Sequence, residues 1–260
     1  MPDGTCKYYE FLPTGDDYDP RHRLEQLRSR AKEFLYTCSW LMGEESDDDY
    51  NSDGHNDMHP IVEQIQSFLK KDEIIAAGFS YGAATASLAA TLEPNRFQCA
   101  ILLDPWLHID YSSRGVEFDL PPEAFGNDWP APGSATTTIN ADTGGTTNND
   151  DSNSKKKKKG LDIPSLFINS AQFRGYGKLY GATQRLADQV NSRNNNEDGT
   201  ADTKRAEMHV IPGTNHQNFC DTIFWLPRRL SKRMFRLGEA DAYESYAAIL
   251  NCTNRFLDRF

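Results

Sequence analysis

The pentapeptide at positions 78–82, Gly-Phe-Ser-Tyr-Gly, constrains this chain more than any other segment because it matches the pattern G-x-S-x-G. That pattern is typical of a serine on a tight turn between a strand and a helix. A short apolar run at 74–77 precedes it, and an alanine-rich stretch at 83–90 follows it. Glycines at both flanks leave room for a strained backbone. We therefore predict that Ser80 is a nucleophile and that the backbone N–H of Tyr81, at the start of the helix, stabilises an oxyanion.

A serine nucleophile needs a base, and His216 is the best placed of the six histidines. It lies in a loop at 212–219, directly after the last strand-like run at 208–211. Serine hydrolases with this motif order their residues along the chain as serine, acid and histidine. A loop histidine is more often only a solvated or capping residue, but the position behind a nucleophile motif favours the base.

Asp104 is the candidate acid. It follows an apolar run at 99–103, which predicts a strand buried on both faces, and Pro105 stops that strand. The carboxylate should therefore lie at the sheet edge where Ser80 emerges. The rival position follows the next strand, at 165–169, but no carboxylate stands there. The alternative interpretation of Asp104 is an acidic residue that only begins a loop.

Apolar runs alternate with helical patterns along the chain, which predicts an α/β fold with a mostly parallel sheet and helices on both faces. Before the motif we predict helices at 20–42 and 60–70. Four apolar residues of the second helix are expected to face inward: Ile61, Ile65, Phe68 and Leu69. Only 7–12 could form a further strand in this region, so the N-terminal strands of the sheet are expected to be missing. A further helix is expected at 175–190.

The length of 260 residues suits one domain, 1–260, with two low-complexity insertions at about 133–160 and 191–203. The lysine run at 155–159 fits a solubilising insertion better than a nuclear signal or a contact with anionic lipid. A net charge of −10 argues against a nucleic-acid partner, because a phosphate backbone would be repelled. The acidic run at 44–49 is most simply a solvated loop and not a metal site.

The five cysteines lack metal-ligand spacing and are expected to be free thiols. No apolar segment near the N-terminus has the pattern of a signal peptide or a membrane span. We expect a cytoplasmic protein with peripheral membrane association. Secretion is the alternative, and it requires a signal peptide lost with the missing N-terminal part.

Taken together, these motifs resemble those of the platelet-activating-factor acetylhydrolases, which include lipoprotein-associated and intracellular type II phospholipases of the α/β-hydrolase superfamily. The matching segments are 28–33, 78–85, 96–106, 166–170 and 213–219. The resemblance implies an α/β-hydrolase fold, a triad of Ser80, Asp104 and His216, no metal and no cofactor. It also implies hydrolysis of the sn-2 acetyl, short or oxidised acyl ester of platelet-activating factor and related phospholipids. The expected partner is this phospholipid at a membrane or lipoprotein surface.

The chain departs from the family pattern at two points. Phe79 stands where the family usually has His, and because it flanks the chemistry we expect little consequence. Family members also carry several strands and an oxyanion loop before the motif, and this chain shows no source for a second oxyanion donor there. Two other functions therefore stay open: an α/β-hydrolase acting on a soluble ester or thioester, and a catalytically impaired relative that only binds.

A segment after the histidine loop combines apolar bulk with positive charge. Leu226, Leu230 and Met234 are spaced four apart and share one helical face, with the basic residues largely off that face. We predict that this helix docks on lipid, because the family meets its substrate surface through this region. The alternative is that the apolar stripe packs on the sheet. The docking candidates are Phe224, Trp225, Leu226, Arg228, Arg229 and Leu230.

Overall fold

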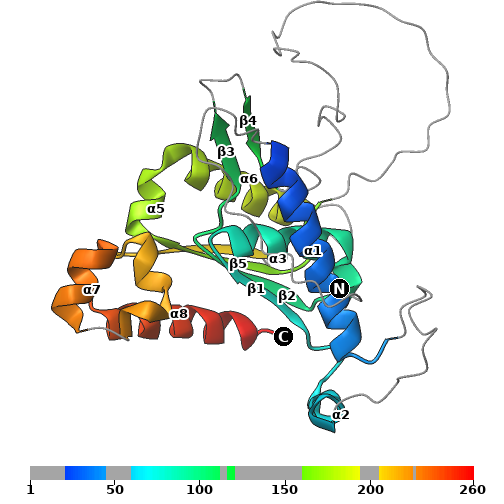
Figure 1. Cartoon of the computed structure of the whole chain (residues 1–260). Helices are drawn as coiled ribbons and strands as arrows, with labels where there is room; N and C mark the ends of the chain where they lie inside the picture. The colour runs from blue at the N-terminus through cyan, green and yellow to red at the C-terminus, as the bar shows by residue number, and fades with distance from the viewer. Residues whose placement is uncertain (1–20, 45–59, 112–115, 121–159, 194–204, 225–226) are drawn as a thin grey trace, which may run out of the picture.

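The computed structural model describes residues 21–44, 60–111, 116–120, 160–193, 205–224 and 227–260 (Figure 1). The strands are β1 (Ile75–Phe79), β2 (Cys99–Leu103), β3 (His108–Tyr111), β4 (Val116–Asp119), β5 (Ser165–Ser170) and β6 (Ala206–Ile211). The α-helices are α1 (Arg21–Leu41), α2 (Pro60–Phe68), α3 (Tyr81–Leu92), α5 (Ala171–Gly175), α6 (Gly177–Arg193), α7 (Arg228–Phe235) and α8 (Ala242–Leu257). Three short 3₁₀ turns complete the described part: η1 (Pro94–Arg96), η4 (His216–Phe219) and η5 (Asp221–Phe224).

Four strands form a parallel sheet in the order β1-β2-β5-β6. In its register, Phe79 pairs with Leu103, and Leu103 pairs with Ile168. Strands that run in one direction bring their carboxyl ends to the same edge, where ligand sites of such sheets form. The predicted parallel sheet is confirmed, and the segments after β1, β2, β5 and β6 meet at one edge.

Helices cover both faces of this sheet, as predicted (Figure 1). On one face α3 and α6 pack directly on the strands and α1 packs on α3, while α8 packs on β5 and β6 from the other face. Side chains alternate along β5: Phe167 belongs to the core under α3 and α6, whereas Leu166 and Ile168 belong to the core over α8. The strand is buried throughout because both of its faces are covered.

The first predicted helix forms as α1, and its apolar stripe is buried where the 3.6-residue period places it, at Leu24, Leu27, Ala31 and Leu35. This helix packs beside the motif through Tyr81, whose hydroxyl donates to the carbonyl of Arg23. The guanidinium groups of Arg23 and Arg30 lie 5.7 and 5.6 Å from the centre of the Tyr81 ring.

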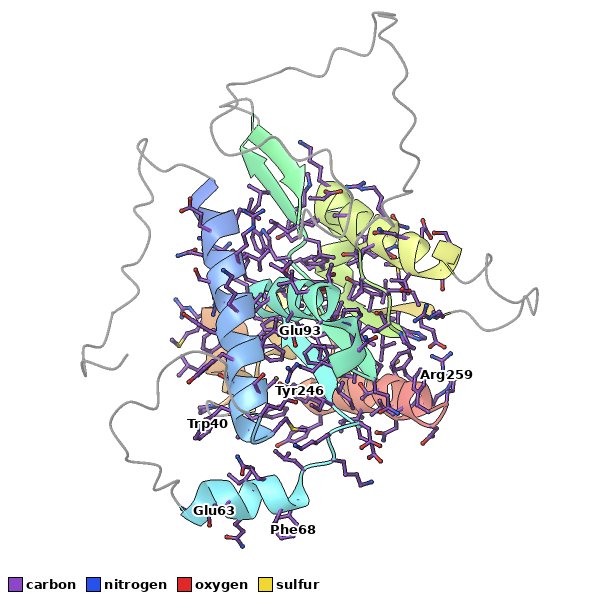
Figure 2. All side chains as sticks on the ribbon, turned by 90° about the vertical axis from the view of Figure 1, so that its right-hand side faces the viewer. Trp40, Glu63, Phe68, Glu93, Tyr246 and Arg259 are labelled. Carbon is purple, nitrogen blue, oxygen red and sulfur yellow. The ribbon has the colours of Figure 1, made fainter. Side chains whose placement is uncertain are left out.

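The second predicted helix forms as α2, but the inward orientation of its apolar residues is wrong. Ile61, Ile65, Phe68 and Leu69 expose 58, 41, 77 and 40% of their surface. Figure 2 shows α2 standing away from the sheet, next to the end of α1 that carries Trp40. Among the described elements its main contact is α1, including a hydrogen bond from Gln66 Nε2 to the carbonyl of Trp40 (3.0 Å). A helical period reveals that an apolar face exists but not what covers it.

A short antiparallel hairpin of β3 and β4 was not predicted, because strands of four residues give too little alternation to detect. Its anchor is the carboxylate of Asp119. This carboxylate accepts hydrogen bonds from Nδ1 of His108 and from the guanidinium of Arg185 on α6, each at 2.8 Å.

Most of the two predicted insertions, and the possible strand at 7–12, lie outside the described residues. The second insertion was predicted to begin at 191, but α6 continues to Arg193. Among the helices that the structure describes, none combines the length and the apolar character that a membrane crossing requires.

The turn between β1 and α3 tolerates a side chain at only one of its two glycines. A Cβ at Gly78 would lie 2.6 Å from the backbone nitrogen of Ala83, whereas a Cβ at Gly82 would meet nothing within 4 Å. The prediction that both flanks need glycine therefore holds for Gly78 and not for Gly82.

We expect Gly78→Ala to lower the free energy of unfolding by about 3 kcal/mol, because it forces the β1 strand and the α3 backbone apart. Gly82→Ala is the matched control and should leave stability unchanged or slightly raised, since alanine favours a helix. Urea unfolding followed by circular dichroism measures both. Equal destabilisation by the two variants would contradict this account.

Candidate active site

Ser80 lies on the turn between β1 and α3, with a φ of 57° and a ψ of −125°. A positive φ is uncommon for a residue with a side chain and marks a strained position that the surroundings must hold. Three backbone hydrogen bonds hold it: Ser80 N–H donates to the carbonyl of Leu103 (2.9 Å), and the Ser80 carbonyl accepts from Trp106 N–H (3.0 Å) and from Ala83 N–H (3.1 Å). Because α3 begins at Tyr81, the positive end of its dipole lies beside the Ser80 hydroxyl.

Asp104 directly follows β2 and is fully buried. Its carboxylate accepts hydrogen bonds from the backbone N–H of Ser170 (2.6 Å) and from the Ser170 hydroxyl (2.7 Å). The Ser170 oxygen in turn caps α5 by accepting from Phe173 N–H (3.1 Å). Ser170 ends β5, where the sequence offers no carboxylate. It instead supplies the donors that the buried carboxylate of Asp104 needs, a role that no sequence signal indicated.

His216 is the first residue of η4, just after β6, and its two ring nitrogens contact the two other candidates. Nδ1 lies 2.9 Å from Oδ2 of Asp104, and Nε2 lies 3.0 Å from Oγ of Ser80. The backbone N–H of His216 donates to Oε1 of Gln172 (2.9 Å). The carboxylate accepts only from a protonated Nδ1, so in the neutral ring Nε2 is left to accept the proton of the Ser80 hydroxyl.

The loop that carries the candidate base is tied to the end of α7. The Oδ1 of the buried Asn218 accepts from Asn215 N–H (2.9 Å) within the loop and from Gly238 N–H (2.8 Å) beyond α7. The amide of Asn215 also donates to the carbonyl of Arg236 (2.7 Å). Two side chains of the loop therefore anchor it to itself and to the segment after α7. This anchoring explains how a short irregular segment holds the imidazole of His216 in one position.

Two aromatic rings flank the imidazole of His216. The ring of Phe79 stacks on it with centroids 4.6 Å apart, and the ring of Phe173 lies at 6.2 Å, also stacked. Phe79 was expected only to flank the site, but it forms part of the packing that orients the imidazole.

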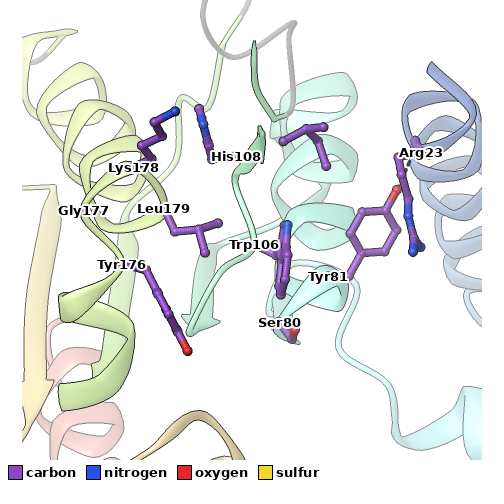
Figure 3. A pocket seen from close by; sticks show the side chains of 10 residues that line it. Arg23, Ser80, Tyr81, Trp106, His108, Tyr176, Gly177, Lys178 and Leu179 are labelled. Atoms are coloured by element: carbon purple, nitrogen blue, oxygen red, sulfur yellow. Dashed lines mark hydrogen bonds between the residues drawn. The ribbon is translucent and has the colours of Figure 1, made fainter. Parts of the chain in front are cut away.

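Two cavities adjoin at this site. The serine cavity, about 570 Å³, contains Ser80 and Tyr81 in its lining, and the histidine cavity, about 710 Å³, contains His216. Trp106, Tyr176 and Leu179 line both cavities. Figure 3 shows Trp106 directly over Ser80 and the hydroxyl of Tyr176 turned toward the same space. Sequence reasoning gave no role to Tyr176 because its position in the cavity depends on how α5 and α6 pack.

The docking candidates differ in their surroundings. Leu230 exposes 44% of its surface on α7, and the neighbouring Arg229 is exposed too. Phe224 exposes 39%, but its ring contacts the rings of Tyr243 and Tyr246 on α8 at 5.2 and 4.8 Å. Trp225, Leu226 and the side chain of Arg228 lie outside the described residues.

None of the described cysteines lines either cavity. Cys38, Cys99, Cys220 and Cys252 are free thiols, as predicted, and Cys6 lies outside the described residues. Burial raises the pKa of the Cys99 thiol to about 11, so it stays protonated at neutral pH. In the described part of the chain, no group of three histidine, cysteine or carboxylate side chains is arranged to hold a metal ion.

The contacts of His216 with Ser80 and Asp104 allow a proton to pass from the Ser80 hydroxyl to an imidazole that a buried carboxylate holds in place. This arrangement has the chemistry of acyl transfer, in which a serine oxygen becomes nucleophilic as its proton leaves.

Curated proteins of other organisms are similar to part of this sequence. Proteins named platelet-activating factor acetylhydrolase, from Canis lupus familiaris and Bos taurus, are each 36% identical over 102 residues. The match covers 38% of this chain and 22% of each relative, so it spans little more than a fifth of their length. A solved structure described as a putative non-heme bromoperoxidase BpoC from Mycobacterium tuberculosis aligns with 67% of this chain at 13% identity and a TM-score of 0.28. A TM-score this low says nothing about the chemistry of this chain.

The sequence profile described as "Platelet-activating factor acetylhydrolase, isoform II" matches residues 9–112 and 152–260. These two stretches make up most of the chain and include Ser80, Asp104 and His216. The chain therefore belongs to the platelet-activating factor acetylhydrolase isoform II family.

Proposed function

We propose that this chain is a serine esterase that hydrolyses the sn-2 acetyl, short or oxidised acyl ester of platelet-activating factor and related phospholipids. The observation that carries the proposal is the unbroken series of contacts from Ser80 Oγ through the ring of His216 to the buried Asp104 (3.0 and 2.9 Å). Family membership supports an ester as the substrate class.

In the first half-reaction, Oγ of Ser80 attacks the acyl carbonyl carbon while Nε2 of His216 takes the hydroxyl proton. The carbonyl oxygen becomes an oxyanion beside the N-terminal end of α3, where the N–H of Tyr81 stabilises it. The bond to the alcohol oxygen then breaks, and His216 gives its proton to that oxygen, which leaves with the lyso-lipid. Water, activated by His216, cleaves the acyl-serine ester in the second half-reaction and restores the Ser80 hydroxyl.

Asp104 has a supporting role in this mechanism. Its carboxylate holds the ring in the tautomer that leaves Nε2 able to accept, and it stabilises the imidazolium formed after proton transfer. Ser170 keeps the carboxylate in position through two short hydrogen bonds (2.6 and 2.7 Å).

The test combines covalent labelling with matched lipid substrates. A fluorophosphonate probe should label the wild-type chain and not Ser80→Ala, while Ser67→Ala, on the surface of α2, serves as the control that keeps labelling. The wild type should also release acetate from a 2-acetyl phospholipid faster than fatty acid from a long-chain one. Labelling without turnover of the phospholipid would favour an esterase for soluble substrates, and no labelling at all would favour a binding protein.

Asp104→Asn should lower kcat for the same ester by a factor on the order of 10⁴, because the asparagine amide favours the wrong histidine tautomer. Asp162→Asn is the control: Asp162 pairs with Arg205 (2.9 Å), away from the candidate site. Steady-state kinetics, with circular dichroism to check folding, provide the measurement. A larger loss in the Asp162 variant would refute the assignment of the acid.

We further propose that α7 docks on the lipid surface. Among the described side chains of this helix, that of Ser231 is buried, whereas the apolar Leu230 and Met234 expose 44 and 59% of their surface, with Arg229 exposed beside them. Apolar residues next to basic ones suit the boundary between acyl chains and anionic headgroups. Met234 also lines the histidine cavity, so a docked helix would bring the cavity to the lipid.

Vesicle co-sedimentation tests this docking. The variant Leu230→Ser, Arg229→Glu should bind vesicles that contain anionic phospholipid about tenfold more weakly, because it loses both apolar burial and attraction. The control Leu250→Ser, Arg255→Glu makes the same changes at exposed positions of α8 and should bind like the wild type. Equal binding by all three proteins would leave α7 with no role at the membrane.

A further inference from the structure

An ester bound between Ser80 and His216 would extend into both cavities at the candidate site. The proton that His216 returns must go to the leaving alcohol oxygen, so this oxygen has to lie within hydrogen-bond reach of Nε2. The oxyanion faces the N-terminal end of α3, on the side of Ser80 and Tyr81. An ester bound in this way would place its alcohol part in the histidine cavity and its acyl part in the serine cavity.

The histidine cavity has an unbalanced charge. Its lining contains aromatic and apolar side chains, two glutamines, His216 and Arg236, and no carboxylate among the described residues. The guanidinium of Arg236 forms no ion pair or hydrogen bond with any described residue, because only its backbone carbonyl is engaged. A cation in such a wall favours an anionic ligand.

The basic residues of the serine cavity differ in this respect. His108 contacts Asp119 (2.8 Å), and Arg23 and Lys178 both have other interaction partners. Among the described basic residues of the two cavities, Arg236 is thus the cation that is open to a ligand.

The backbone of Arg236 is held in an uncommon conformation beside the candidate base. It follows α7 with a φ of 49°, a left-handed geometry that is uncommon for a residue with a side chain. Its carbonyl accepts from the amide of Asn215, the residue before His216 (2.7 Å). This hydrogen bond therefore holds the backbone of Arg236 next to the histidine loop.

We infer that Arg236 binds the phosphate of the leaving lyso-phospholipid and that the histidine cavity is the subsite for the glycerophosphate part of the substrate. A guanidinium offers paired N–H donors that match two phosphate oxygens, which gives orientation as well as attraction. The aromatic and apolar walls suit the glycerol carbons that join this phosphate to the ester. The assignment rests on the proposed esterase function and adds to it the group that the site recognises.

The experiment compares two soluble esters that differ only in the phosphate: a short-chain 2-acetyl glycerophosphocholine and the matching neutral 2-acetyl glycerol. Both are used below the concentration at which they aggregate, so that membrane docking plays no part. For the wild type, kcat/KM should be about tenfold or more higher for the phosphate-bearing ester than for the neutral ester. Arg236→Gln should bring that ratio close to one by lowering only the value for the phosphate ester, and Arg236→Lys should restore part of it.

Arg233→Gln is the matched control. It removes one positive charge from the last turn of the same helix, but Arg233 does not line the histidine cavity. It should keep the wild-type ratio. An equal fall of the ratio in both glutamine variants would assign the effect to surface charge and overturn the subsite, as would an unchanged ratio in Arg236→Gln.

A second measurement needs no variant. Glycerophosphocholine should inhibit hydrolysis of the neutral ester by the wild type competitively, and glycerol at the same concentration should not. Absence of this inhibition would overturn the subsite even if Arg236→Gln failed to fold. Failure of the proposed function looks different: the wild type would then cleave neither ester.

Discussion

One buried carboxylate determines the geometry of the whole site. Asp104 is fully excluded from solvent, where an ionised group without donors would cost several kcal/mol. Ser170 and His216 supply those donors, and the three residues follow or end three different strands: β2, β5 and β6. Because these contacts come from three different segments, correct assembly of the sheet edge also aligns His216 with Asp104.

The sequence predicted the parts of this arrangement that depend on short signals. An apolar run that ends in a polar residue marks the carboxyl end of a strand, and a parallel sheet brings such ends together. These two facts suffice to bring Ser80, Asp104 and His216 near one another without any knowledge of the packing. The buried stripe of α1 was predicted for a similar reason, since a helix that packs along its length repeats its apolar residues every turn.

The remaining features depend on partners far away in the sequence. The apolar face of α2 looks like a buried stripe, yet no described element covers it. Ser170 carries a hydroxyl like any other serine, and only the approach of β2 to β5 gives it Asp104 as a partner. The stacking of Phe79 on His216 likewise requires the register of β1 and the course of the loop after β6, neither of which the local sequence specifies.

The hydrogen bonds between the histidine loop and the end of α7 have a mechanical consequence. Asn218 bonds to Gly238, and Asn215 bonds to Arg236, so two hydrogen bonds join the loop directly to the segment that follows α7. A displacement of α7 of even an ångström would stretch these bonds or carry the imidazole with it. Load applied to the outer surface of that helix would therefore act on the loop that holds the imidazole of His216 beside Ser80.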